Sequence, residues 1–280
     1  MKTRIIDMSI KELESALDKS EISSVDIAKS YIAQIEKVDD KIGAYLYINK
    51  EAVKQAEALD TKRKNGEKLG RLAGMPIALK DNMCTVDMPT TCASKMMQGY
   101  MSPFDAEVVK RLKGEDAIML GKVNLDEFAM GGSTENSYYK ITTNPHDISR
   151  VPGGSSGGSA ASVVSHQALV ALGSDTGGSI RQPASFCGAV GIKPTYGSVS
   201  RSGLVAFASS LDQIGPIARN VEDAALTLEV LIGHDAKDST SVKFEKPSYE
   251  TEIKKDIKGM KIALPREFFE QGVQIDVKES

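Results

Sequence analysis

Two segments rich in glycine and serine lie close together in this sequence: GGSSGGSA at 153–160 and GSDTGGSIR at 173–181. A flexible linker of this composition should lead into a new domain, but both segments stand between apolar stretches. A Walker loop needs Gly-Lys followed by Ser or Thr, and the one Gly-Lys pair is followed by Val123. The GxGxxG spacing of dinucleotide-binding loops fails in both segments as well. The remaining chemistry is that of a serine nucleophile on a glycine-rich backbone.

Glycine has no Cβ, so main-chain N–H groups can crowd around a point where negative charge develops. The run Asp175-Thr-Gly-Gly-Ser179 could form such an oxyanion hole, with Ser179 as the nucleophile. One oxyanion donor can contribute roughly 3–4 kcal/mol of transition-state stabilisation.

A nucleophilic serine needs a base, and no histidine here stands beside an obvious orienting carboxylate. Lys80 ends the apolar run Met75–Leu79, which predicts a buried stem and hence a lowered pKa. The competing interpretation is an ion pair between Lys80 and the adjacent Asp81, which would raise the pKa of Lys80. The residues alone leave these two interpretations about even.

Three motifs together resemble the amidase signature family, serine hydrolases that cleave amides with a Ser–Ser–Lys triad. They are Lys80-Asp-Asn, Pro152-Gly-Gly-Ser-Ser-Gly-Gly and Gly177-Gly-Ser-Ile-Arg181, in the family's order and at its separations. Within the family, the chain resembles the branch formed by the A subunits of the glutamyl-tRNA(Gln)/aspartyl-tRNA(Asn) amidotransferases. Three stretches carry that likeness: Asn124–Asn136, Ala171–Tyr196 and Gly203–Pro216.

The resemblance implies a role for each matching residue. Ser179 would be the nucleophile, Lys80 the base, and Ser155 a bridge between them that follows a cis peptide bond. Further residues would bind the oxyanion or line the substrate pocket: Thr176, Gly177, Gly178 and the Ser179 amide for the oxyanion, and Gly131 for the pocket. For Ser156 and Ser159 we prefer a packing role, and for Asp175 and Arg181 a bracing ion pair.

The resemblance also implies the reaction and its partners. Glutamine would be hydrolysed through an acyl-enzyme, and the ammonia would pass to a B subunit that amidates mischarged Glu-tRNA or Asp-tRNA. A small C subunit would hold the complex together. ATP and Mg²⁺ would be used by the partner subunit, and this chain would need no cofactor.

The composition agrees with a chain that leaves the binding of tRNA to a partner subunit. The chain has 280 residues, 41% of them hydrophobic, and a formal net charge of −3, which gives no basic field for binding RNA directly. The three cysteines and three histidines follow no metal-binding spacing, so we expect no metal site. We find no leader pattern and no apolar run near 18 residues, and expect a soluble cytoplasmic protein without membrane contact.

The elements that must position these residues follow from periodicity. Capping signals and 3.6-residue spacing predict helices from Ser9, from Ser23 or Ser24, and from about Asn49, as a helical layer over residues 1–70. Residues 71–280 would form the α/β core of the amidase signature fold, a mixed β-sheet covered by helices on both faces, in one structural domain with the N-terminal layer. Strand-length apolar runs lie at four places: Pro76–Leu79, Ala117–Leu120, Ala168–Leu172 and Lys261–Leu264.

Further helices are expected from Ser102 to Gly114 and from Asn220 to Gly233. Residues 234–258 are polar and are expected to form a long surface connection. Full-length family members are longer, so we expect the C-terminal part of the fold, with the ligands of the glutamine carboxylate and amino groups, to be missing. Two alternatives to the glutaminase stay open: a stand-alone amidase for another small amide, and a truncated scaffold subunit without catalysis.

Overall fold

A six-stranded mixed β-sheet forms the centre of the molecule, whose computed structural model describes residues 4–270 and 272–279. The strand order is β1-β3-β2-β4-β6-β5. Strands β3, β2 and β4 are parallel neighbours, whereas β1, β6 and β5 each pair antiparallel with their neighbours. The strand bounds are β1 Tyr45–Ile48, β2 Pro76–Lys80, β3 Ile118–Val123, β4 Val170–Asp175, β5 Val190–Gly191 and β6 Gln213–Ala218. The expected mixed sheet is confirmed.

Helices surround this sheet. Their bounds are α1 Ile10–Asp18, α2 Ser24–Ile42, α3 Ala52–Lys64, α4 Glu107–Gly114, α5 Gly157–Val164, α6 Arg181–Cys187, α7 Val221–Leu231, α8 Tyr249–Glu252, α9 Glu267–Glu270 and α10 Ile275–Glu279. Short 3₁₀ turns lie at Ile5–Asp7, Lys95–Met97 and Glu127–Ala129. The capping boxes predicted at Ser9 and Ser23 are both formed, with Glu12 and Asp26 as the returning carboxylates. Each box satisfies N–H groups that a helix start otherwise leaves unpaired.

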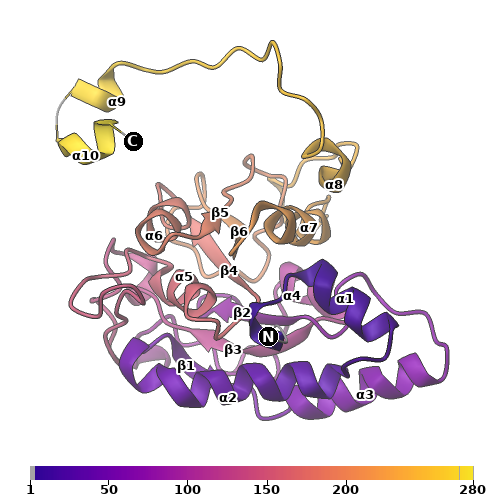
Figure 1. Cartoon of the computed structure of the whole chain (residues 1–280). Coiled ribbons are helices and arrows are strands. Elements are labelled where there is room, and N and C mark those ends of the chain that lie inside the picture. The colour runs from indigo at the N-terminus through magenta and orange to yellow at the C-terminus, as the bar shows by residue number, and fades with distance from the viewer. Residues whose placement is uncertain (1–3, 271, 280) are drawn as a thin grey trace.

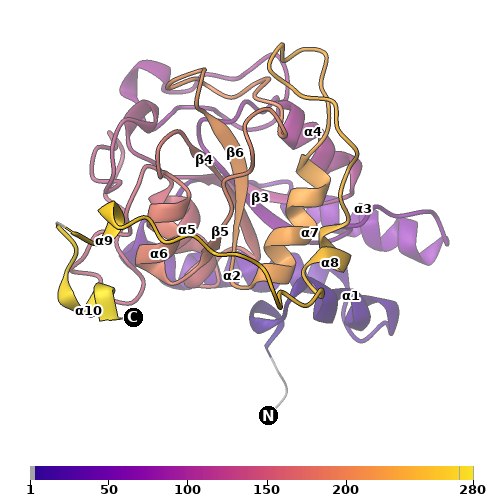
Figure 2. The same cartoon turned by 90° about the horizontal axis from the view of Figure 1, so that it is seen from above.

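The helices form layers on the sheet. Helices α5 and α6 lie on one side and α7 on the other, while α2 and α3 pack against each other in a row below the sheet in the view of Figure 1 (Figures 1 and 2). Strands β2, β3, β4 and β6 are buried along their whole length. That burial agrees with their nearly continuous apolar sequences, which is the pattern of a sheet covered on both faces.

The N-terminal layer is continuous with the rest of the core. One hydrophobic cluster extends from Ile6 to Ile232 and includes residues of α1, α2 and the sheet. Polar contacts join the same parts: the Ile10 N–H donates to Asp223 Oδ1 at 3.0 Å, and Gln34 Nε2 donates to Ser165 O at 2.8 Å. The sequence pattern therefore changes at residue 70, but residues on both sides of that position pack into the same hydrophobic cluster.

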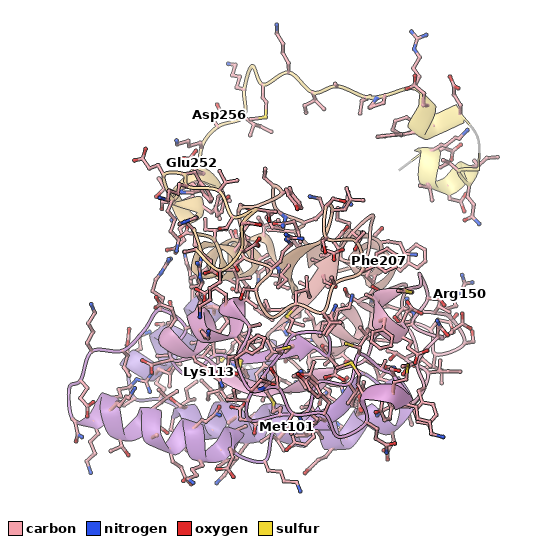
Figure 3. All side chains as sticks on the ribbon, turned by 180° about the vertical axis from the view of Figure 1, so that it is seen from behind. Met101, Lys113, Arg150, Phe207, Glu252 and Asp256 are labelled. Atoms are coloured by element: carbon pink, nitrogen blue, oxygen red, sulfur yellow. The ribbon has the colours of Figure 1, made fainter. Side chains whose placement is uncertain are left out.

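Several expectations need correction. The strand predicted at Lys261–Leu264 is wrong, because 261–264 has no regular structure and the Ile262 side chain is exposed. Beyond α8 the chain runs away from the sheet before α9, as Figure 3 shows past the labelled Glu252 and Asp256. An apolar run can form a strand only where a neighbouring strand supplies hydrogen-bond partners.

Other differences concern element boundaries. Helix α4 begins at Glu107 instead of near Ser102, because the Ser102 hydroxyl bonds the Phe104 backbone in a turn. Helix α3 begins at Ala52, three residues after the expected start, and the short strands β1 and β5 had no clear sequence signal.

Candidate active site

The ends of β2 and β4 and the start of α5 bring the predicted residues together. Lys80 is the last residue of β2 and is fully buried. Its Nζ lies 2.7 Å from Ser155 Oγ, 2.9 Å from Ser156 Oγ and 2.9 Å from Ser174 Oγ. Lys80 thus contacts Ser155, as expected, together with two serines whose contact with it was not expected.

The ion pair that competed for Lys80 does not form. The Asp81 carboxylate is bound instead by Lys122, with Nζ 3.1 Å from Oδ1. Burial lowers the pKa of Lys80 to about 7, even though the carboxylates of Asp126 and Asp175 oppose that shift. At neutral pH a large share of Lys80 is therefore the uncharged amine that a base must be.

The hydrogen bonds around Lys80 fit a neutral amine with two N–H donors and one lone pair. The Ser156 hydroxyl donates to the Ser174 carbonyl at 3.1 Å, so its oxygen is free to accept from Lys80. Ser174 Oγ accepts from Asn82 Nδ2 at 3.0 Å and is a second acceptor for Lys80. Nζ also lies 3.3 Å from the Ser174 carbonyl, so the acceptors around a neutral Lys80 outnumber its two N–H donors even without Ser155. Such an arrangement is compatible with a Ser155 hydroxyl that donates to the lone pair of Lys80. Ser156 thus has a polar contact with Lys80, beyond the packing role that we had preferred.

Ser179 adjoins this cluster through the backbone. The Ser156 N–H donates to the Ser179 carbonyl at 3.1 Å, which places the turn before α6 against the start of α5. Ser155 is fully buried and follows a cis peptide bond after Gly154, as the resemblance implied, whereas Ser179 is half-buried. The half-buried serine is the one that a substrate can reach.

The turn 175–179 offers backbone donors next to Ser179. Among the residues that the structure describes, the N–H groups of Thr176, Gly177 and Ser179 have no protein acceptor within hydrogen-bond distance. The Gly178 N–H, in contrast, donates to Asp175 Oδ1 at 2.6 Å. Three of the four N–H groups predicted to bind the oxyanion are therefore without a protein acceptor in the described part of the chain, whereas the Gly178 N–H stabilises the turn through its bond to Asp175.

Asp175 and Arg181 brace this turn, as the sequence led us to expect. Arg181 Nε lies 3.0 Å from Asp175 Oδ2, and the Ile180 N–H donates to the same oxygen at 3.1 Å. Burial alone would raise the pKa of Asp175, but the bonds from Arg181 and from the Gly178 and Ile180 amides hold that pKa below its usual value. The carboxylate stays charged and fixes the turn.

The loop that contains Gly131 lies against the same serines. A Cβ on Gly131 would come within 2.3 Å of Asp126 Cγ, and one on Gly154 would come within 2.2 Å of Asp126 Oδ2. Gln182 connects the two segments, since its Nε2 donates to Gly132 O at 3.0 Å and its Oε1 accepts from the Gly154 N–H at 2.8 Å. The sequence offered no signal for Gln182 beyond its place three residues after Ser179.

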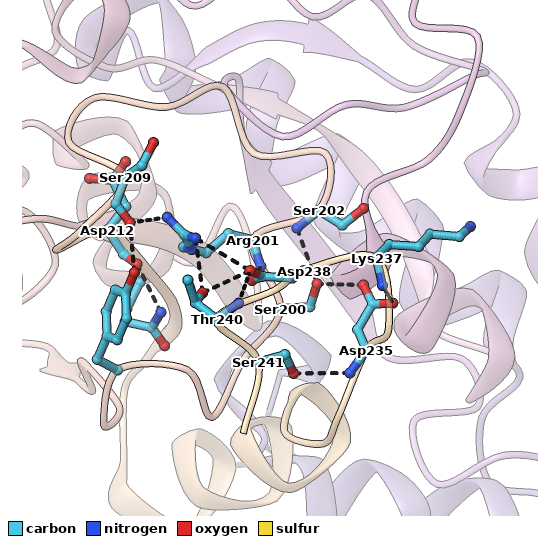
Figure 4. A network of polar contacts seen from close by, with 12 residues as sticks. Ser200, Arg201, Ser202, Ser209, Asp212, Asp235, Lys237, Asp238, Thr240 and Ser241 are labelled. Carbon is cyan, nitrogen blue, oxygen red and sulfur yellow. Dashed lines mark hydrogen bonds and ion pairs between the residues drawn. The ribbon is translucent and has the colours of Figure 1, made fainter. Parts of the chain in front are cut away.

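A cavity of about 270 Å³ lies beside the turn, lined by Arg201, Ser202, Leu204, Ala206, Ser209, Asp212, Lys237, Asp238 and Ser239. Asp212 links the cavity to the turn, because its Oδ1 accepts from Thr176 Oγ1 at 2.5 Å. Figure 4 shows its polar wall, where Arg201 binds Asp238 and Thr240. The cavity is therefore connected to the turn through Asp212, while none of residues 175–179 lines it.

Comparison with known proteins decides the family. The Amidase family model matches residues 26–280. The chain belongs to the Amidase family. The A subunit of the glutamyl-tRNA(Gln) amidotransferase of Carboxydothermus hydrogenoformans is 58% identical over 274 residues, which are 98% of this chain and 56% of that protein. A corresponding A subunit of Clostridium acetobutylicum is 56% identical, covering 98% of this chain and 58% of its own length. The chain thus spans little more than half the length of these relatives.

Solved structures confirm the amidase fold. The crystal structure of the A subunit of the glutamyl-tRNA(Gln) amidotransferase of Thermotoga maritima has a TM-score of 0.78 and 47% identity, covering 88% of this chain and 51% of that one. The peptide amidase of Stenotrophomonas maltophilia has a TM-score of 0.81 and 36% identity, covering 86% and 51% of the two chains. Sequence identity is thus higher to the amidotransferase structure than to the peptide amidase.

No helix among the described residues is long and apolar enough to cross a membrane. Nor do three or more His, Cys, Asp or Glu side chains gather as metal ligands within that part of the chain.

Proposed function

We propose that this chain carries the amide-hydrolysing centre of a glutamine amidotransferase, with Ser179 as nucleophile, Ser155 as bridge and Lys80 as base. The observation that carries the proposal is the buried Lys80 Nζ, whose pKa is lowered to about 7, at 2.7 Å from Ser155 Oγ. A base with a pKa near the working pH combines a high neutral fraction with a useful driving force for proton transfer.

In the proposed reaction, Ser179 Oγ attacks the amide carbon of glutamine as its proton passes to Ser155 Oγ and the Ser155 proton passes to Lys80. The carbonyl oxygen becomes an oxyanion, which the open N–H groups of Thr176, Gly177 and Ser179 stabilise. The proton on Lys80 returns through Ser155 to the departing nitrogen, and ammonia leaves an acyl group on Ser179. Water then attacks the acyl carbon with the same proton relay and releases glutamate.

The finer assignment is to the A subunit of an enzyme that converts mischarged Glu-tRNA(Gln), Asp-tRNA(Asn) or both. Its support is the level of identity, 58% to one such protein and 36% to the peptide amidase. In this assignment the B and C subunits are the partners, and ATP and Mg²⁺ are used by the B subunit in the cytoplasm. The small net charge of −3 fits a chain that leaves tRNA binding to a partner.

Ammonia release from glutamine tests the proposal, measured with and without the B and C subunits. We expect turnover that increases with the partners, and its loss in Ser179→Ala with an unchanged circular dichroism spectrum. Ser185→Ala is the matched control, because Ser185 lies exposed on α6, six residues after Ser179. Full activity of Ser179→Ala would falsify the assignment of the nucleophile.

A second candidate is a stand-alone amidase for another small amide. The structural likeness to the peptide amidase favours it. Hydrolysis of amidated peptides at a rate that the B and C subunits do not change, together with no release of ammonia from glutamine, would support this candidate over the first.

A further inference from the structure

Beneath the proposed site, on the other face of the sheet, lies a second buried lysine. Lys122 of β3 pairs in register with Leu79 of β2, while Lys80 pairs with Val123. Successive side chains of a strand point to opposite faces, so Lys122 projects away from the side on which Lys80 meets Ser155. Both lysines are fully buried.

Lys122 is held by three groups of the segment that follows Lys80. Its Nζ contacts Asp81 Oδ1 at 3.1 Å, donates to Met83 O at 2.8 Å and donates to Thr90 Oγ1 at 3.1 Å. The other Asp81 oxygen accepts from the N–H of Thr91 at 3.0 Å and from its hydroxyl. The Asp81 carboxylate is thereby paired with Lys122 and Thr91 on its own side of the sheet.

The two lysines and Asp81 act on one common neighbour. Burial raises the pKa of the Cys92 thiol to about 12; the Asp81 charge adds to that shift, and Lys122 and Lys80 reduce it. The Cys92 N–H also donates to the Asp81 carbonyl at 2.9 Å. Asp81 follows Lys80 directly in the chain, so an unbalanced charge on Asp81 would act on Lys80 over a short distance.

On its own face, Lys80 is already surrounded by acidic groups. The carboxylates that raise its pKa are those of Asp126 after β3, Asp175 at the end of β4 and Asp212 before β6. One more uncompensated carboxylate, at the residue next to Lys80, would add to this effect and keep the lysine protonated.

We propose that Lys122 is a positioning residue for the amide-hydrolysing centre: it neutralises Asp81 and so leaves Lys80 free to act as an uncharged base. This proposal rests on the proposed function of Lys80. It predicts that the two members of the pair have opposite effects on Lys80 and that their joint removal has almost none.

The test is a direct titration of Lys80 by NMR in protein labelled with ¹³C at the lysine ε-carbon, with the signal assigned from Lys80→Arg. Lys122→Met should raise the pKa of Lys80 by about one unit, since it leaves the Asp81 charge unbalanced. Asp81→Asn should lower that pKa by about one unit, since it leaves the Lys122 charge unbalanced. The double variant Asp81→Asn/Lys122→Met should return it to within about 0.3 units of the original value.

A kinetic readout accompanies the titration. Acylation of Ser179 by an activated amide, followed by intact-protein mass spectrometry, should slow about fivefold at pH 7 in Lys122→Met and recover in the double variant. At pH above about 9 the single variant should approach the unmodified rate, because Lys80 is then neutral again. A purely structural role would lower the rate equally at every pH.

Removing one member of a buried ion pair is strongly destabilising, whereas replacing both is often tolerated. If neither single variant folds while the double variant does, an unchanged Lys80 pKa in the double variant supports the pairing of the two charges, and a displaced one overturns the proposal. Shifts of the same sign in both single variants, or none in either, also overturn it. The titration needs no turnover, so opposite pKa shifts without acylation would support the pairing and count against the proposed function.

Discussion

At the residue scale, the candidate site depends on one lysine that is kept without a counter-ion. Asp81 is adjacent in sequence but lies on the opposite face of the sheet with Lys122. The side chains that contact Lys80 directly are serine hydroxyls, and the nearby carboxylates of Asp126, Asp175 and Asp212 raise its pKa less than burial lowers it. Burial then decides its pKa.

This burial makes stability depend on pH in a defined direction. The pKa of Lys80 is about 7 in the folded protein and near its ordinary value of 10.5 when unfolded. Between these values the unfolded chain binds more protons, so the free energy of unfolding rises with pH by up to about 1.4 kcal/mol per unit. The Lys80→Met variant lacks this contribution of Lys80 to the pH dependence. In urea titrations, we therefore expect the free energy of unfolding of the wild type to rise relative to that of Lys80→Met between about pH 7 and about pH 10.

The control for that comparison is Lys68→Met, at an exposed lysine. Its stability should follow the wild type in parallel over the same pH range. Parallel curves for Lys80→Met would contradict a lowered pKa of Lys80.

At the element scale, the start of α5 determines where Ser155 and Ser156 lie. The helix can approach the end of β3 because its second residue is Gly158, whose N–H donates to Asn124 O at 3.2 Å. A Cβ at this position would come within 2.4 Å of the same oxygen. The glycines of the 153–160 segment therefore permit close contact between backbones, and the second half of the segment is helical.

Gly158→Ala should push α5 away from β3, because the Asn124 backbone cannot yield as a flexible side chain would. We expect the free energy of unfolding to fall by about 1–3 kcal/mol, and Ser179 acylation to slow as Ser155 shifts from Lys80. Denaturant titration and acylation rates measure the two effects.

Gly114→Ala is the matched control, because Gly114 ends α4 with no atom within 4 Å of an added Cβ. It should leave stability unchanged or raise it by up to about 1 kcal/mol. Equal losses in the two variants would contradict the packing argument.

At the scale of the whole molecule, the N-terminal helices and the sheet share one hydrophobic cluster. Leu13 of α1 is fully buried in that cluster, and the neighbouring Ile10 N–H reaches Asp223 at the start of α7. We propose that the N-terminal helical layer up to residue 70 and the core from residue 71 to the end of α8 make up a single structural domain, which the exposed segment after α8 does not join.

A shared core should unfold in one step. We expect calorimetry to give a single unfolding transition. Leu13→Ala should lower the free energy of unfolding by about 2–5 kcal/mol and still give a single transition. Two separate transitions, with only the first sensitive to Leu13→Ala, would instead indicate an independent helical layer.

The sequence by itself determined the local features of this protein. Capping boxes at Ser9 and Ser23, the apolar runs of β2, β3 and β4, and the glycine-serine motifs are all encoded within a few neighbouring residues. The resemblance carried by those motifs led to the family and to Lys80, Ser155 and Ser179 as candidates.

Only the tertiary structure decided which charges meet. Whether Asp81 binds Lys80 depends on the register of β2 against β3, and the contacts of Ser156 and Ser174 with Lys80 depend on how α5 packs on β4. The failure of the run at Lys261–Leu264 to form a strand has the same origin. Each outcome is set by partners distant in sequence, whose positions are fixed by packing and not by the local pattern.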